Sequence, residues 1–220
     1  MRKEALIVEL PESVKRYTVG DVSNHLVRWN PDPWRDVFRG FDEVFLSLSE
    51  HVISNGGITR SYVHDRAAGD PVELFLLAMA WGYGTIGYGP TRVNKILSQT
   101  DSRAKLADIV VATRAGGAEA GWIALLRQHR IKGLGMAFGT KLLYFAGYSC
   151  QSRPRPLILD QFVRRALHQL IDPAMPVKTI VRLDDYLRYL EVAECAASQL
   201  GEPDVLEYAL FELGKGLSRA

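Results

Sequence analysis

The sequence predicts an all-α protein whose helices form two lobes. Apolar residues recur at three- and four-residue intervals through most of the 220-residue chain, which is the spacing of an amphipathic helix. Gly, Pro and Asp residues separate these stretches and supply the usual helix stops and N-caps. Strand-like alternation of apolar and polar residues is almost absent. The length suits a single domain, residues 1–220, in which one lobe needs chain from both ends to close.

The predicted helices follow one another with short connections. The first comes after the Pro-containing residues 30–33 and covers 34–54. The second begins at Pro71, after an Asp70 suited to N-capping, and its apolar run ends at Trp81, so we expect it to be buried. Seven more helices are expected at 90–99, 102–113, 117–129, 138–147, 160–170, 183–199 and 203–217. The β-branched segment 6–10 has no second strand to pair with and is expected to be a packed arm.

Composition excludes several classes of protein. The chain is 47% hydrophobic and 24% charged, which is ordinary for a globular fold and unlike a disordered or fibrous chain. No apolar run approaches the roughly 20 residues that span a bilayer, and Glu4 and Glu9 interrupt any signal-peptide core. Cys150, Cys195 and the scattered histidines lack metal-ligand spacing. We therefore expect a cytoplasmic protein with no membrane contact, no metal and no cofactor.

The net charge of +2 conceals a strongly basic segment. From Arg130 to Arg165 there are seven basic residues and one acid, Asp160. A surface of this kind follows a phosphate backbone. A solvated charge run without a partner is the alternative interpretation.

Residues 82–87 match the pattern GxGxxG but not its context. A dinucleotide fingerprint needs a strand before the glycines and an acidic residue on a second strand, whereas here a long apolar helix leads into them. We interpret the segment as a tight connection between helices. Its aromatic neighbours, Trp81, Tyr83 and Tyr88, either pack inside or line a cleft where they could stack on a base.

A second glycine pair lies between two predicted helices, in the sequence IKGLGMAFGTKLLYF at 131–145. Gly133 and Gly135 leave backbone amides uncovered, and amides at the start of the next helix can bind a phosphate. Such a hairpin grips DNA without reading its sequence. Taken alone, it could also be a plain helix connection.

Nineteen positions after Lys141, an apolar run ends in Asp160, which opens a helix containing Val163, Arg164 and Arg165. With the hairpin, this segment resembles the helix-hairpin-helix DNA glycosylase superfamily over 131–167. The nearest likeness is to bacterial proteins described as 8-oxoguanine glycosylase-like, through GLG, TKLLYF, the Leu-Asp dipeptide and EYALFELGK at 207–215.

The resemblance implies a nucleoid-associated, monomeric enzyme that acts on double-stranded DNA carrying a modified base. It implies Asp160 and Lys141 as catalytic residues. The DNA contacts that it implies are Lys132, Gly133, Leu134, Gly135, Gly139, Thr140, Arg164 and Arg165. There is one departure, because the family's lysine would fall on Ala137 if counted from the hairpin. Four residues are about one helical turn, so Lys141 reaches the same face in either alignment; a lysine that contacts phosphate is the alternative.

Three functions are consistent with this segment. The first is repair of oxidised bases such as 8-oxoguanine, with strand cleavage at the abasic site if Lys141 is a nucleophile. The second is removal of a hypermodified base from invading phage DNA. The third is a non-catalytic helix-hairpin-helix module, against which the presence of both Lys141 and Asp160 argues. For an enzyme, an aspartate suits the chemistry because positive charge builds up on the sugar as the glycosidic bond breaks.

Overall fold

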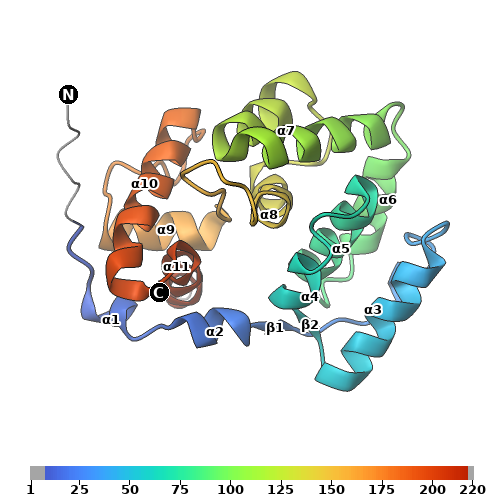
Figure 1. Cartoon of the computed structure of the whole chain (residues 1–220), viewed down its shortest axis with the longest axis horizontal. Helices are drawn as coiled ribbons and strands as arrows, with labels where there is room; N and C mark the ends of the chain where they lie inside the picture. The colour runs from blue at the N-terminus through green and yellow to red at the C-terminus, as the bar shows by residue number, and fades with distance from the viewer. Residues whose placement is uncertain (1–7, 218–220) are drawn as a thin grey trace.

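The computed structural model describes residues 8–217 and has the predicted all-α, two-lobed fold (Figure 1). Its α-helices are α1 Glu12–Lys15, α2 Val19–Ser23, α3 Asp42–Asn55, α4 Arg60–His64, α5 Pro71–Tyr83, α6 Gly89–Leu97, α7 Ser102–Ile123, α8 Met136–Ala146, α9 Gln161–Leu170, α10 Leu183–Leu200 and α11 Pro203–Leu217. A 3-10 helix, η1, covers Asp32–Trp34, and a π-helical stretch, η2, covers Ala124–Gln128.

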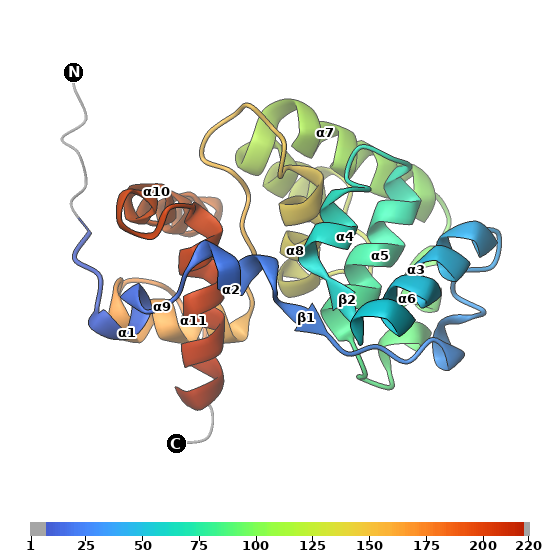
Figure 2. The same cartoon turned by 60° about the horizontal axis from the view of Figure 1, so that its bottom comes forward.

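The two lobes draw on different parts of the chain. Helices α1 and α2 pack with α9, α10 and α11 in one lobe, and α3 to α8 form the other (Figure 2). The first lobe therefore combines both ends of the chain, as the sequence predicts. Helices α9 and α11 pack closely in this lobe, because a side chain at Gly214 of α11 would clash with the backbone of Phe162 in α9.

The second lobe is built around α5. Residues 74–80 of this helix are fully buried, and the helix packs on α7 and α8. This confirms the buried helix that the unbroken apolar run predicts. Asp70 caps it, since its carboxylate accepts hydrogen bonds from the amides of Val72 and Glu73 at 2.8 and 3.0 Å.

Two predicted helix boundaries were wrong. The first predicted helix, 34–54, is helical only from Asp42, because Gly40 adopts a φ of +83° that ends the preceding turns. Buried Val37 and Phe38 give that segment its apolar spacing without helix. The expected helices 102–113 and 117–129 are instead one helix, α7, kinked at Gly117 and continued by η2.

The joined helix Ser102–Gln128 changes one expectation. By length and composition alone, this helix is long and apolar enough to cross a membrane, whereas the sequence predicted two shorter helices and no membrane-spanning segment. Half of its most apolar window is buried inside the protein. A buried core helix meets the same criteria.

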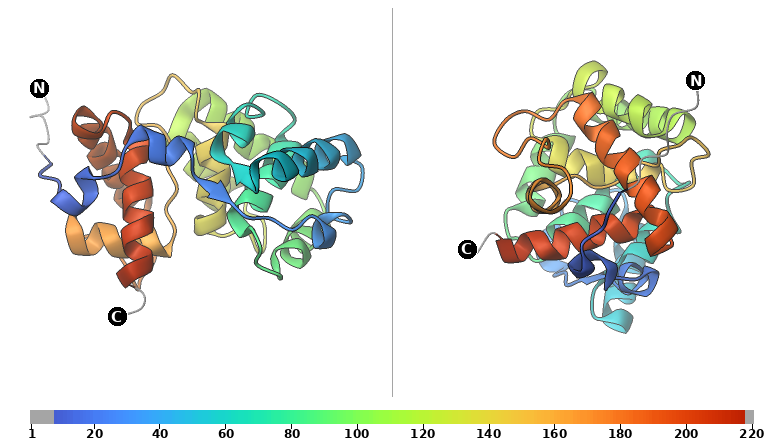
Figure 3. Two further views of the ribbon diagram at one scale, coloured as in Figure 1. Left: turned by 90° about the horizontal axis from the view of Figure 1, so that it is seen from below. Right: turned by 90° about the vertical axis from the view of Figure 1, so that its left-hand side faces the viewer.

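The N-terminal segment connects the lobes. Residues 6 and 7 of the expected arm lie outside the described residues. Leu10 is buried and the carbonyl of Val8 accepts a hydrogen bond from Gln199, so the described part does pack as an arm. The chain then crosses to the second lobe (Figure 3, left). There β1, Leu26–Val27, pairs antiparallel with β2, Ile58–Thr59, in the register Leu26↔Thr59, a pairing the sequence did not predict.

Candidate active site

A cavity of about 420 Å³ collects residues from both lobes. This volume lies within the usual range for a pocket that encloses a small organic group. The cavity is lined by side chains from the N-terminal segment, α4, α5, α8, the start of α9 and α11. Among them are His25, Arg60, Trp81, Phe138, Lys141, Asp160, Phe162, Glu207 and Phe211. The cavity therefore depends on segments that are remote in sequence.

Lys141 and Asp160 meet in the wall of this cavity. The Nζ of Lys141 lies 3.2 Å from Oδ2 of Asp160, and the two residues are only 7% and 8% exposed. The other carboxylate oxygen, Oδ1, caps α9 by accepting the amides of Phe162 and Val163 at 3.0 and 3.2 Å. One oxygen thus holds the helix and the other faces the lysine.

Hydrogen bonds from two other helices hold the buried backbone of residues 157–159, which precede Asp160. The amide of Leu159 donates to the hydroxyl of Thr140, one residue before Lys141, at 3.0 Å. Tyr186 binds both backbone groups of Leu157, accepting from the N–H and donating to the C=O. These bonds satisfy backbone groups that no sheet satisfies here, and they fix the distance between Lys141 and Asp160.

Gly82, in the last turn of α5, also shapes the site. A Cβ built on Gly82 would lie 2.8 Å from Cδ of Lys141 and 3.2 Å from the ring of Phe138. Phe138 in turn stacks on Tyr83, with ring centroids 3.9 Å apart. Gly82 therefore leaves the room that the lysine stem occupies. The connection between α5 and α6 is shorter than the expected 82–87, because Gly82 and Tyr83 still belong to α5. Gly82 borders the Lys141–Asp160 pair.

The hairpin connects η2 to α8 beside the cavity. Gly133 has a φ of +92°, which favours glycine, and Gly135 is the N-cap of α8. The backbone N–H and C=O of Lys132 both bind the amide of Gln99, at 3.2 and 2.8 Å, which pins the hairpin next to α6. The side chain of Leu134, between the two glycines, is buried and packs the hairpin onto the protein core.

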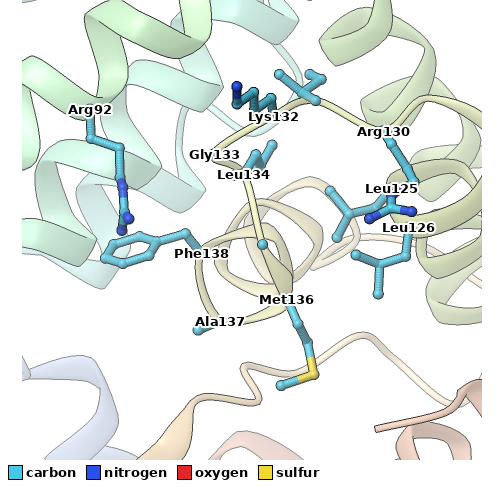
Figure 4. Close-up of a pocket in the computed structure, with 12 residues that line it drawn as sticks. Arg92, Leu125, Leu126, Arg130, Lys132, Gly133, Leu134, Met136, Ala137 and Phe138 are labelled. Atoms are coloured by element: carbon cyan, nitrogen blue, oxygen red, sulfur yellow. The ribbon is translucent and has the colours of Figure 1, made fainter. Parts of the chain in front are cut away.

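A groove of about 860 Å³ lies along this hairpin. Figure 4 shows that it is bordered by Arg92, Arg130 and Lys132 and that Met136 and Phe138 lie on its α8 side. Phe138 and Ala137 line both this groove and the cavity. The basic groove and the Lys141–Asp160 pair are therefore neighbours.

The other predicted DNA contacts do not gather there. Gly139 and Thr140 are buried in α8, where Gly139 packs on Leu125 and the Thr140 hydroxyl accepts from Leu159. Arg164 donates to the carbonyls of Pro176, Val177 and Thr179, so it shapes the loop after α9. Arg165 lies in the same helix, beside a separate surface cavity. Gly139, Thr140 and Arg164 thus have packing or structural contacts within the protein, and their contacts with DNA stay a prediction.

Sequence reasoning missed a second polar cluster in the cavity wall. Arg60 and Glu207 form an ion pair at 2.6 Å between Nη1 and Oε2, and they are 2% and 1% exposed. The Nε of Arg60 also donates to Nδ1 of His25 at 3.3 Å. Glu207 opens the EYALFELGK stretch already noted, but no local pattern marks Arg60 or His25, which come from unrelated short segments.

The cluster sets the charges of its members. Burial lowers the pKa of His25 to about 3, with the nearby charge of Arg60 acting in the same direction, so this histidine is neutral. Burial also raises the pKa of Glu207 above its ordinary value, while the charge of Arg60 opposes that rise. For Arg60, burial lowers the pKa, but Glu207 and Tyr144 together outweigh burial, and the pKa is raised.

No metal-binding group of three or more His, Cys, Asp or Glu residues occurs within residues 8–217. The side chains that line the cavity offer an amine, a carboxylate and a neutral imidazole, set among aromatic rings.

Comparison with known proteins gave one finding. A family model described as "Putative 8-oxoguanine DNA glycosylase OGG-like protein" matches residues 20–211. That range includes all the cavity residues named above, from His25 to Phe211. The search of curated proteins and the search of solved structures gave no match.

Proposed function

Because the chain belongs to the family of 8-oxoguanine DNA glycosylase OGG-like proteins, we propose that it excises an oxidised base such as 8-oxoguanine from double-stranded DNA. The observation that carries this proposal is the Lys141–Asp160 pair, 3.2 Å apart in the wall of a cavity beside a basic hairpin groove. The proposed substrate is bound by a monomer acting on the nucleoid in the cytoplasm.

The proposed binding mode uses the hairpin and the cavity in sequence. Backbone amides at Gly133 and Gly135 grip the phosphates of one strand, and Arg92, Arg130 and Lys132 add positive charge. The damaged nucleotide turns out of the helix into the cavity, since the glycosidic bond cannot be reached inside the duplex.

Two exposed apolar residues suit the wedge that base flipping needs. Ile86 and Tyr88 line the cavity and are 44% and 57% exposed, on the connection between α5 and α6. An apolar side chain inserted between base pairs fills the gap that the flipped nucleotide leaves. We propose this connection as the wedge.

Asp160 is proposed to stabilise the transition state. As the base departs, the sugar becomes cationic, and a fixed carboxylate close to the anomeric carbon offsets that charge. Oδ1 accepts hydrogen bonds from the two backbone amides at the start of α9, and these bonds hold the carboxylate in place while Oδ2 takes no part in the cap. The carboxylate is therefore oriented before the substrate arrives.

Lys141 is proposed as the nucleophile. In its neutral form the amine attacks the anomeric carbon, a C–N bond forms, and the bond to the base breaks; the proton that the amine sheds is available to the departing base. Opening of the sugar ring then gives an imine, from which the 3′ phosphate is eliminated and the strand is cut. The contact of Nζ with Oδ2 of Asp160 and the space that Gly82 leaves for the side chain position the amine for this attack.

The direct test is a set of otherwise identical duplexes, each with one modified base, incubated with the wild-type protein and with Asp160→Asn. We expect release of 8-oxoguanine by the wild-type protein only. Asp36→Asn serves as the matched control, because Asp36 is exposed and pairs only with Arg39. Binding without release from any duplex would instead favour the non-catalytic module, and release of only a hypermodified base would favour phage defence.

A further inference from the structure

The buried pair of Arg60 and Glu207 calls for an explanation other than stability. Removing two charges from water costs several kcal/mol per ion, and apolar residues of similar size often replace such pairs without loss. Arg60 is enclosed by rings, with its guanidinium carbon 5.2 Å from the centroids of both Trp81 and Tyr144. The pair nevertheless lies in the cavity wall, where Arg60 binds two groups that line the cavity, His25 and Glu207 itself.

The first group is His25. An arginine N–H can only donate, so the bond from Nε of Arg60 makes Nδ1 of His25 an acceptor. The ring is neutral, and its one proton must then sit on Nε2. Within residues 8–217 no acceptor is bound to that nitrogen. His25 therefore offers the cavity an N–H donor.

The second group is Glu207. Its Oε2 accepts from Arg60 at 2.6 Å, and the ion pair favours the ionised carboxylate, which can only accept hydrogen bonds. The other oxygen, Oε1, has no protein donor within the described residues. Glu207 lines the same cavity as His25 and therefore offers it an acceptor.

Building on the proposed function, we propose that His25 and Glu207 are specificity-determining residues that read the N7–H and C8=O edge of an 8-oxopurine, with Arg60 as the positioning residue that fixes both. The donor of His25 matches the C8 oxygen and the acceptor of Glu207 matches N7–H.

The chemistry of the bases selects that edge. Guanine and thymine in normal DNA already carry an N–H beside a carbonyl on their pairing edges, so reading such an edge there would not separate damage from undamaged DNA. At N7, however, undamaged guanine and adenine have an acceptor, which would face the carboxylate of Glu207 unpaired. Oxidation at C8 converts N7 to a donor. A fixed acceptor at this position therefore rejects normal purines, because an unpaired buried polar group is costly.

The test measures binding in the Asp160→Asn background, where turnover is blocked. Two duplexes carry 8-oxoguanine or 8-bromoguanine, which has a bulky C8 group but keeps N7 as an acceptor. We expect the 8-oxoguanine duplex to bind about 30-fold more tightly, as the loss of a buried hydrogen bond implies. Adding Arg60→Met with Glu207→Leu should bring that ratio to about 1, because apolar replacement of both partners leaves no unpaired charge.

Two further variants complete the experiment. Adding His25→Phe alone should reduce the preference for the 8-oxoguanine duplex while leaving the Arg60–Glu207 ion pair in place. This variant tests the proposal even if Arg60→Met/Glu207→Leu does not fold. The matched control is Arg188→Met with Asp172→Leu, which removes another ion pair, 2.8 Å long and outside the cavity, and should leave the ratio at about 30-fold. Binding to a duplex with a tetrahydrofuran abasic-site analogue, which has no base, should be equal in all variants.

An unchanged ratio in folded Arg60→Met/Glu207→Leu or His25→Phe protein would overturn the assignment. So would a parent that binds both duplexes equally although the wild-type protein releases 8-oxoguanine. Failure of the proposed function gives a different result, namely that the wild-type protein releases no base from any duplex.

Discussion

Asp160 combines a structural and a chemical task, and two substitutions separate them. Asparagine keeps an oxygen that can accept the amides of Phe162 and Val163, but it removes the negative charge. Alanine removes both the cap and the charge. Both variants also deprive Lys141 of its ion-pair partner, and because its side chain borders the cavity, its amine can turn toward water in either variant.

The size of the effect on activity follows from the geometry. A unit positive charge 3.2 Å from this carboxylate, the distance at which Lys141 Nζ lies, interacts by about 5 kcal/mol at an effective dielectric constant of about 20. A sugar cation at a similar distance would lose most of that stabilisation in either variant. Since about 1.4 kcal/mol is a factor of ten in rate, we expect excision to fall about a thousandfold in both.

The size of the effect on stability differs between the variants. Asn and Asp are equivalent N-caps, whereas Ala at such a position costs about 1 kcal/mol. For a chain of this length that corresponds to a melting temperature about 2–4 °C lower in Asp160→Ala than in Asp160→Asn.

Single-turnover release of 8-oxoguanine and thermal unfolding, measured on both variants, test this reasoning. The two variants should be equally inactive but differ in melting temperature. Near-normal release by Asp160→Asn would refute the charge argument. A loss of activity confined to Asp160→Ala would show that the cap, and not the charge, supports excision.

Four more predictions concern the lysine, the glycine beside it, the hairpin and the salt dependence of DNA binding. Borohydride added during turnover should trap a covalent protein–DNA adduct that disappears in Lys141→Gln; base release without any adduct from the wild-type protein would mean that water is the nucleophile. Gly82→Ala should lower excision about tenfold with little change in melting temperature, because the lysine stem gives way, whereas Gly216→Ala, where an added Cβ would meet open space away from the cavity, should leave excision unchanged. Gly133→Ala should weaken binding to all duplexes alike, since its φ of +92° is strained for alanine. Wild-type affinity should fall steeply with salt, and a flat salt response would contradict phosphate binding.

The parts of the fold that the sequence predicted are those with strong local signals. The buried α5 carries a cap, a proline start and an unbroken apolar run, and each predicts the same helix. The segment 34–41 failed because Val37 and Phe38 are buried for tertiary reasons, and burial produces the same apolar spacing as a helix face. The split of α7 failed because Gly117 kinks the helix without ending it.

The candidate site divides in the same way. Lys141 and Asp160 lie within one contiguous segment, so their spacing is visible in the sequence, and the structure does bring them together. Gly139 and Thr140 lie in that segment too, but a motif does not tell which face of α8 a residue occupies. Their burial follows from packing against the π-helical stretch and the run before Asp160.

The cluster of His25, Arg60 and Glu207 could not be predicted because nothing local requires it. His25 lies in the connection between α2 and β1, Arg60 opens a five-residue helix, and Glu207 is in the last helix. Each is an ordinary polar residue in its own segment, and only the crossing of the N-terminal chain between the lobes brings the three together. The pairing of β1 with β2 fixes that crossing, since it holds residues 26–27 against residues 58–59, immediately next to His25 and Arg60. A two-residue strand pair adds little stability, so its effect here is positional: it sets where His25 and Arg60 lie in the cavity wall.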